Sequence, residues 1–166
     1  MRLFVSLGSN VRPGHFLPRA VAELRRRFHV VAVSPAYRTA PAGDSDQPDF
    51  LNLAVELDSE LPPEEVQTAL HEIEDALGRE RDPRRPFGPR TADLDLVLIP
   101  GVVGRFGSLE LPSPQLAAEA FVAVPVADLA PELVHPVLGV SLGDVARSTL
   151  ATTNVPPRAV ALEIPQ

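Results

Sequence analysis

The chain has 166 residues, 45% of them hydrophobic, and this length and composition predict a single domain, 1–166, with a substantial core. Its 15 basic and 22 acidic residues give a net charge of −7, which argues against a nucleic-acid-binding surface. The lack of cysteine excludes disulfides and thiolate metal sites, and no apolar stretch approaches the roughly 20 residues of a membrane span. The apolar run at the N-terminus is too short for a signal peptide, so we expect a soluble, cytoplasmic protein without membrane association.

The hydrophobic periodicity predicts, in chain order, a strand, a helix, two strands, a second helix and a further strand, at residues 2–7, 17–28, 29–39, 50–57, 62–77 and 93–99. This β-α-β-β-α-β order predicts an α+β fold of the ferredoxin-like type, a four-stranded antiparallel sheet with the two helices packed on one face. Beyond residue 100 we expect a C-terminal extension with short helices. We also expect a core that ends at about residue 148 and a loosely held, proline-containing tail at 149–166.

Two carboxylates stand at the start of the last predicted strand. Alternate residues of a strand share a face, so Asp93 and Asp95 are expected to point the same way, together with Val97 and Ile99. Their Cα atoms would lie roughly 6.5–7 Å apart. Two interpretations stay open at this point: ion pairs with the arginines of segment 79–90, or a site for divalent cations such as Mg²⁺.

An aromatic ring and an amide share a face at the start of the strand at 50–57. Phe50 and Asn52 alternate with the apolar residues of the opposite face. The pair either belongs to the core and a turn, or forms the wall and the hydrogen-bonding edge of a pocket for a flat heterocycle. His71 lies off the apolar stripe of the helix at 62–77, which is more typical of a solvated side chain.

Several short motifs stand out along the chain, and the most specific is Gly88-Pro89-Arg90-Thr91-Ala92-Asp93-Leu94-Asp95. The other motifs are Leu7-Gly8-Ser9-Asn10, Tyr37-Arg38-Thr39-Ala40-Pro41, Gln47-Pro48-Asp49-Phe50-Leu51-Asn52 and Ala130-Pro131-Glu132-Leu133-Val134-His135-Pro136. Over roughly residues 3–139, these motifs resemble those of the hydroxymethyl-dihydropterin pyrophosphokinase family of folate biosynthesis.

The resemblance implies an enzyme that transfers pyrophosphate from ATP to a pterin alcohol and releases AMP. It implies two Mg²⁺ ions held by Asp93 and Asp95. The pterin site would be lined by Thr39, Ala42, Phe50, Asn52, Phe87 and Phe121. The nucleotide contacts would be Glu74, Arg79, Arg81, Arg90 and Ile99, and the catalytic residues would be Arg79, Arg90 and Asp95. Loops 40–49 and 79–90 would close over the substrates. ATP and the pterin would be the partners of a protein that we expect to be a monomer.

Two positions depart from the family pattern, and both would face ATP. The family usually has a Pro-His-Pro-like turn where this chain has Pro112-Ser113-Pro114, and an arginine where this chain has Glu119. Losing a phosphate-contacting cation slows phosphoryl transfer, so we expect an enzyme of reduced activity. One alternative is a non-catalytic relative that binds pterin or nucleotide, or that acts as a partner protein. Another is an unrelated ferredoxin-like interaction module, in which the aspartates are only surface charge.

Overall fold

The computed structural model describes residues 1–41, 46–78, 83–84 and 91–166. The strands are β1 (Arg2–Ser9), β2 (His29–Val33), β3 (Ala36–Thr39), β4 (Phe50–Asp58), β5 (Asp93–Leu98), β6 (Gly104–Phe106), β7 (Leu109–Leu111) and β8 (Arg158–Val160). The helices are α1 (Pro13–Arg27), α2 (Pro63–Ala76), α3 (Pro114–Ala118), α4 (Ala120–Leu129) and α5 (Leu142–Thr152).

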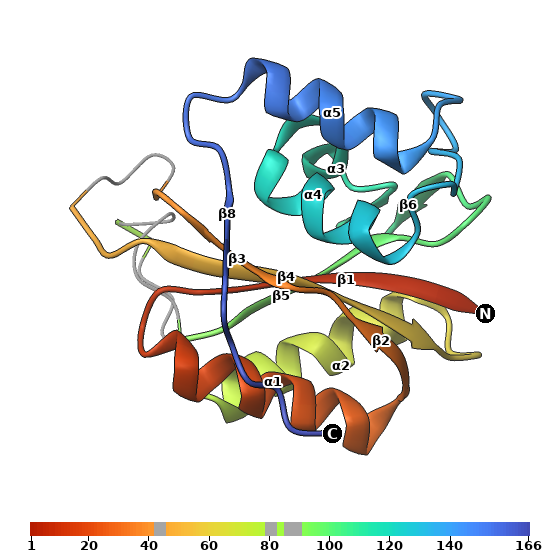
Figure 1. Cartoon of the computed structure of the whole chain (residues 1–166). Coiled ribbons are helices and arrows are strands. Elements are labelled where there is room, and N and C mark those ends of the chain that lie inside the picture. Colours follow the sequence, from red (N-terminus) through yellow and green to blue (C-terminus); the bar gives the residue numbers. More distant parts are fainter. Residues whose placement is uncertain (42–45, 79–82, 85–90) are drawn as a thin grey trace.

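One antiparallel sheet forms the middle layer of the molecule (Figure 1). Its strand order is β5-β1-β4-β3-β8, with β2 also paired to β4, and every pair is antiparallel. Helices α1 and α2 cover the lower face, and α3, α4 and α5 of the C-terminal extension cover the upper face (Figure 1). The predicted ferredoxin-like α+β fold is confirmed. The sheet has six strands rather than four because one predicted strand is divided and the tail adds another.

The predicted strand at 29–39 is divided at Ser34 and Pro35 into β2 and β3. Proline has no N–H to donate to a sheet ladder, which favours an interruption there. Ser34 stays attached to β4 at the break. Its N–H donates to the Ala54 carbonyl at 2.9 Å, and its Oγ accepts from the Ala54 N–H at 2.8 Å.

The two faces of the sheet bury separate cores. On β1, Leu3, Val5 and Leu7 point into the lower core, and Phe4 points into the upper core. The pleat places Ser6 and Gly8 on the same face as Phe4. The upper core therefore ends along β1, and small residues take the place of apolar side chains toward its C-terminal end.

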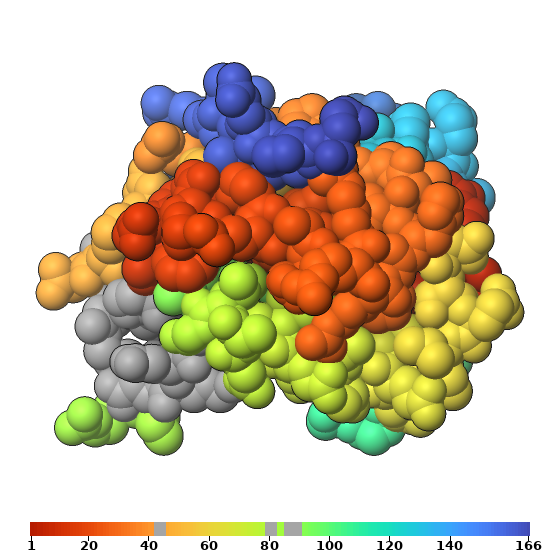
Figure 2. Space-filling view, turned by 90° about the horizontal axis from the view of Figure 1, so that it is seen from below, coloured from red at the N-terminus to blue at the C-terminus, as the bar shows by residue number. Residues whose placement is uncertain are grey.

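The tail at 149–166 completes α5 and then crosses the edge of the sheet. Residues of β8 pair with β3, and the C-terminus lies beside α1 in the lower layer (Figure 1). Seen from below, the C-terminal segment (blue) lies alongside α1 (Figure 2). The sequence predicts a loosely held tail, but in the structure this segment pairs with the sheet and has partly buried side chains.

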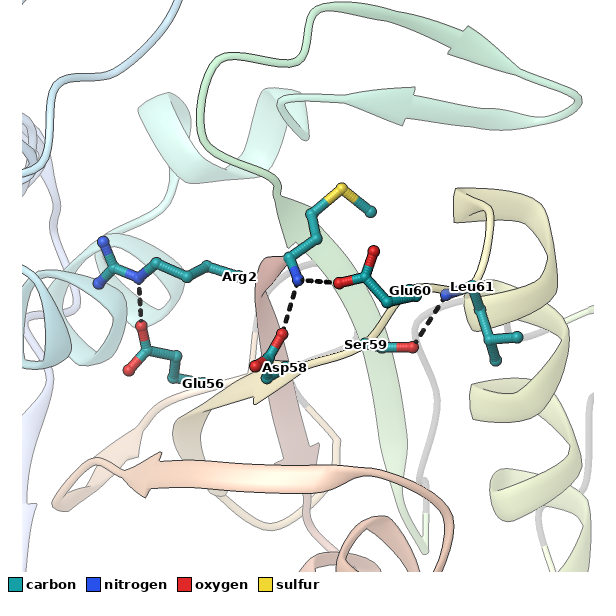
Figure 3. Close-up of polar contacts among 7 residues, drawn as sticks. Arg2, Glu56, Asp58, Ser59, Glu60 and Leu61 are labelled. Carbon is teal, nitrogen blue, oxygen red and sulfur yellow. Dashed lines mark hydrogen bonds and ion pairs between the residues drawn. The ribbon is translucent and has the colours of Figure 1, made fainter.

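Ion pairs join the beginning of β1 to the end of β4. The Met1 ammonium group lies 2.6 Å from Asp58 and 2.7 Å from Glu60, and the Arg2 Nε donates to Glu56 at 2.6 Å (Figure 3). These carboxylates raise the pKa of the ammonium group, which in turn lowers the pKa of Asp58. Among the helices of the described residues, none combines the length and the apolar character that crossing a membrane requires.

Candidate functional site

Strand register brings the predicted site residues of three strands together on the upper face. Gly8 of β1 lies opposite Asp93 of β5 on one side and opposite Asn52 of β4 on the other. Asn52 is in turn opposite Tyr37 of β3. Directly paired residues point to the same face, and adjacent strands lie about 4.8 Å apart. The carboxylate of Asp93 and the amide of Asn52 therefore flank Gly8, with backbones about 10 Å apart.

Gly8 is required at the centre of this row because the Asn52 side chain lies over it. A Cβ at Gly8 would come within 2.9 Å of the Asn52 Oδ1. The Asn52 Nδ2 donates to the Thr39 Oγ1 at 2.6 Å, and each of these two side chains is only 4% exposed. The sheet thus holds a buried amide in one orientation, and Asn52 lies within β4 rather than in a turn.

The other strand pairs extend this polar area along the face. Phe50 lies opposite Thr39, and Asp95 lies opposite Ser6. Phe50 is half-buried, as are both aspartates. Phe121 is half-buried in the first turn of α4 and packs against the upper core. The structure therefore places Thr39, Phe50, Asn52, Asp93 and Asp95 on one face of the sheet, beneath the layer that carries Phe121.

Side chains of α2 bind the outer edge of β5, where the sheet ends. The Leu94 N–H donates to the Glu74 Oε2 at 3.1 Å, and the Leu96 N–H donates to the Gln67 Oε1 at 3.3 Å. Glu74 is 1% exposed. The two acceptors are seven residues apart, and therefore lie on the same side of the helix. They fix the segment of β5 that carries Asp93 and Asp95. The sequence pattern does not single out Gln67, and for Glu74 the resemblance implies only a nucleotide contact.

Ile99, just after β5, is a predicted site residue that does not lie on this face. β1 pairs Val5 with Leu96 but Phe4 with Leu98, so the register shifts by one residue at Val97. As in a β-bulge, the alternation then changes, and Val97 and Leu98 both enter the upper core. Ile99 lies in the lower core and is 1% exposed. The prediction that Ile99 shares the face of the aspartates is therefore wrong.

A buried asparagine joins two of the motifs. Asn10 follows β1 and is 3% exposed. Its Nδ2 donates to the Gln47 Oε1 at 2.7 Å and to the Pro48 carbonyl at 3.1 Å. The end of β1 thus holds the segment that leads into Phe50. The sequence predicts only a turn at residues 8–10. The amide side chain of Asn10 is the one feature of the motif that indicates its contact with Gln47 and Pro48.

The two positions that depart from the family pattern lie at helix ends. The Ser113 Oγ accepts from the Gln115 N–H at 3.3 Å and caps α3, and the Ser113 N–H donates to the Val97 carbonyl at 2.8 Å. Glu119 separates α3 from α4, is half-buried and makes no side-chain capping bond. Both side chains are therefore set by helix ends rather than by sheet register.

Ser113 also lines a pocket of about 330 Å³ together with His135 and residues of the β6–β7 hairpin. The His135 Nδ1 accepts from the Val137 N–H at 3.2 Å and from the Leu138 N–H at 3.1 Å. An accepting Nδ1 requires the neutral ring with its proton on Nε2. Burial lowers the pKa of His135, which also favours the neutral form.

Five predicted site residues lie outside the described residues: Ala42, Arg79, Arg81, Phe87 and Arg90. Within the described part of the chain, no three His, Asp or Glu side chains form a cluster suited to a metal ion. The candidate metal ligands there are the two aspartates of β5.

Comparison with known proteins gives consistent matches. Residues 4–131 match the family model described as 7,8-dihydro-6-hydroxymethylpterin-pyrophosphokinase (HPPK). The 2-amino-4-hydroxy-6-hydroxymethyldihydropteridine pyrophosphokinase of Pseudomonas aeruginosa is 42% identical over 135 residues, which cover 80% of this chain and 82% of that protein. The protein of the same name from Bacillus subtilis is 39% identical over 129 residues, 76% of each chain.

Among solved structures, the chain is similar to the HPPK-DHPS of Plasmodium falciparum, wild type with STZ-DHP. The TM-score is 0.70 at 11% identity, and the match covers 90% of this chain and 43% of that one. This chain therefore spans less than half of the solved protein. At this identity the similarity supports the fold alone.

Proposed function

The chain belongs to the 7,8-dihydro-6-hydroxymethylpterin-pyrophosphokinase family, and from this membership we propose how its residues serve the reaction. The protein transfers pyrophosphate from ATP to hydroxymethyldihydropterin in folate biosynthesis. The observation that carries the proposal is the row of Asp93, Gly8 and Asn52, which separates a carboxylate end from an amide end on one face. The pterin binds at the amide end, and the phosphates of ATP lie at the carboxylate end.

At the amide end, Asn52 and Thr39 recognise the edge of the pterin, and the rings of Phe50 and Phe121 contact its faces. A pterin is a flat heterocycle whose edge carries hydrogen-bond donors and acceptors. A buried amide held by its neighbour distinguishes such a ligand from one without those groups, because an unmatched buried amide is costly. Gly8 contributes no side chain of its own, which leaves the space that the Asn52 amide occupies above it.

At the carboxylate end, Asp93 and Asp95 would hold two Mg²⁺ ions. The donor set fits: Mg²⁺ needs few protein carboxylates and takes its other ligands from water and phosphate. When bound, Mg²⁺ would neutralise charge on the phosphates of ATP. Glu74 and Gln67 keep the two carboxylates in register by binding the β5 backbone. Arg79, Arg81 and Arg90 as phosphate contacts, with Ala42 and Phe87 at the pterin, stay predictions.

The nucleotide end of the proposed site comprises Asp93, Asp95, Ser113 and Glu119. The last two residues support the proposal that turnover is lower than in relatives with histidine and arginine at these positions. A carboxylate at Glu119 repels phosphate by about 1–2 kcal/mol at 8–10 Å with an effective dielectric near 20. The monomeric state and the cytoplasmic location stay predictions. A relative that binds pterin without catalysing transfer is the alternative that Ser113 and Glu119 favour.

The test is product formation. The purified protein is incubated with Mg-ATP and 6-hydroxymethyl-7,8-dihydropterin, and AMP and pterin diphosphate are measured for the wild type, Asp95→Ala and Asp144→Ala. Asp144 is an exposed carboxylate on α5, so its variant controls for the loss of an acidic group. We expect Asp95→Ala to lose at least about 10²-fold in kcat and Asp144→Ala to match the wild type.

Equal product from the wild type and Asp95→Ala would contradict the assigned role of the aspartates. Pterin binding without product from the wild type would instead support the non-catalytic alternative. Titration with an inert ATP analogue then measures the affinity for the nucleotide separately.

A further inference from the structure

Strand β3 carries the pterin-side residue Thr39, but it is poorly anchored by its own sequence. It has four residues, is separated from β2 by the break at Ser34 and Pro35, and pairs with β4 through only three residues. Short strands at the edge of a sheet open readily, because few hydrogen bonds hold them. A rigid Thr39–Asn52 pair therefore needs further support for β3.

The C-terminal segment 158–164 supplies this support from the outer side. β8 pairs residue by residue with β3: Arg158 with Arg38, Ala159 with Tyr37, and Val160 with Ala36. Beyond the strand, Leu162 and Ile164 pack against the lower core. The Arg25 guanidinium of α1 donates a hydrogen bond to the Pro165 carbonyl. The segment thus turns β3 into an interior strand, and it is itself anchored below the sheet (Figures 1 and 2).

Tyr37 holds β3 from the upper face. It lies two residues before Thr39 and therefore points to the same face of the sheet. Its hydroxyl donates to the Asp128 Oδ2 near the C-terminal end of α4. The first turn of the same helix carries Phe121. This hydrogen bond connects the strand that holds Thr39 to the helix that holds the opposite aromatic wall.

We propose that the C-terminal segment 158–164 and the Tyr37–Asp128 hydrogen bond are positioning elements for the pterin end of the site. Both act through β3: the segment fixes its outer edge, and the hydrogen bond fixes its distance from α4. Neither element needs to touch the substrate. The inference rests on the proposed function, because it assumes that Thr39 and Asn52 bind the pterin.

The position of Tyr37 in the sheet makes the two elements one unit. Tyr37 is the residue of β3 that pairs with Asn52 of β4 on one side and with Ala159 of β8 on the other. A shift of β8 therefore moves the backbone that carries both the phenol and, two residues later, the Thr39 hydroxyl. Asp93 and Asp95 lie on the far side of β1 and β4, so the nucleotide end is expected to be insensitive to such a shift.

The experiment compares KM for the pterin with KM for ATP in variants of the full chain. Tyr37→Phe removes only the hydroxyl, and the double variant Leu162→Ser/Ile164→Ser removes the apolar anchors of the segment. Val155→Ser is the matched control, because Val155 is an exposed apolar residue just before β8. Hydrogen exchange at Ala36–Thr39 reports the stability of β3 directly.

We expect Tyr37→Phe and the double variant to raise KM for the pterin by about 2- to 10-fold, the equivalent of one hydrogen bond. KM for ATP is expected to be unchanged, and the double variant is expected to exchange faster at β3. Val155→Ser should match the wild type in each measurement. An unchanged KM for the pterin in Tyr37→Phe, or an equal rise of both KM values, would overturn the inference.

Asn52→Ala separates failure of the inference from failure of the proposed site. If Asn52→Ala raises KM for the pterin and the positioning variants do not, only the inference is wrong. If Asn52→Ala also leaves KM for the pterin unchanged, the pterin end has been assigned wrongly, and the inference falls with it. Tyr37→Phe keeps the test decisive if the double variant does not fold.

Discussion

The two ends of the candidate site are built in different ways. At the pterin end, Asn52 and Thr39 are buried, and their positions follow from the register of β3 and β4. Ser113 and Glu119, which we propose lie near the nucleotide together with the register-fixed Asp93 and Asp95, are half-buried residues at helix ends. A residue fixed by sheet register cannot change without disturbing its cross-strand partners, whereas a helix end tolerates many residues. This difference explains why the two departures from the family pattern fall at helix ends, whereas the motif residues on the strands, Asp93 and Asp95 included, are kept.

Among the changes that test this contrast, the largest effect is expected from Gly8→Ala, which tests whether register dictates the pterin end. The new methyl group would lie 2.9 Å from the Asn52 Oδ1 and must displace the amide from Thr39. Overpacking of this kind costs about 1–3 kcal/mol, so kcat/KM for the pterin should fall by about 5- to 150-fold. Steady-state kinetics with varied pterin and with varied ATP would measure the change.

Gly14→Ala is the matched control, because a Cβ at that position in α1 would meet nothing within 4 Å beyond its chain neighbours and the backbone of its own helix. We expect it to leave both KM values unchanged and to stabilise the protein slightly, since alanine favours helix over glycine by about 1 kcal/mol. Wild-type kinetics in Gly8→Ala would show that the amide is not held against Gly8, and would remove the contrast between the two ends.

The sequence was sufficient where the structure depends on local periodicity. The strand period of two correctly places Asp93 with Asp95 and Phe50 with Asn52, because a pleat requires no distant partner. The same rule fails at Ile99, because the register shift at Val97 arises from pairing with β1. Local pattern can therefore find the pairs of site residues, but it cannot place them relative to the neighbouring strand.

The parts that could not be predicted depend on contacts distant in the sequence. β8 has only three residues, Arg158–Val160, and no strong hydrophobic pattern, so its pairing with β3 supplies the strand conformation. The Glu74 and Gln67 contacts with β5 depend on how α2 packs against the edge of the sheet. The position of Asp93 two strands away from Asn52 depends on the strand order. None of these relations can be read from a window of neighbouring residues.

A second prediction concerns the nucleotide end, where Glu119→Arg should improve the enzyme. The change replaces repulsion of the ATP phosphates with attraction, and screening by salt reduces the combined effect of the two charges at 8–10 Å to about 1–2 kcal/mol. The helix end should accept arginine, because the Glu119 side chain makes no capping bond. We expect kcat/KM for ATP to rise by about 5- to 30-fold and KM for the pterin to stay unchanged.

Glu65→Arg makes the same change of charge at an exposed position in the first turn of α2 and controls for net charge. A similar gain in both variants would show that the effect comes from overall charge rather than from the nucleotide end. A fall in kcat/KM for ATP in Glu119→Arg alone would contradict the placement of this residue near the phosphates.

The smallest effect is expected from a change of pH, measured as a change in the free energy of unfolding. Acid should weaken the region around His135 but leave the Tyr37–Asp128 hydrogen bond intact. Near the pterin end, burial and the hydrogen bond with Asp128 raise the pKa of Tyr37 to about 12, so this hydroxyl keeps its proton over the neutral range. Near the nucleotide end, burial lowers the pKa of His135 below its usual value. The folded state then binds fewer protons than the unfolded state, and stability should fall as the pH drops below about 6.5.

Protonation of His135 would also remove the acceptor at Nδ1 that binds the Val137 and Leu138 N–H groups. His135→Asn keeps an acceptor for these groups but does not titrate. Urea unfolding between about pH 5 and pH 7.5 should therefore show a weaker loss of stability toward acid in His135→Asn than in the wild type. The same slope in His135→Asn and the wild type would mean that other groups govern acid sensitivity, and that the region around Ser113 is no more sensitive to pH than the pterin end.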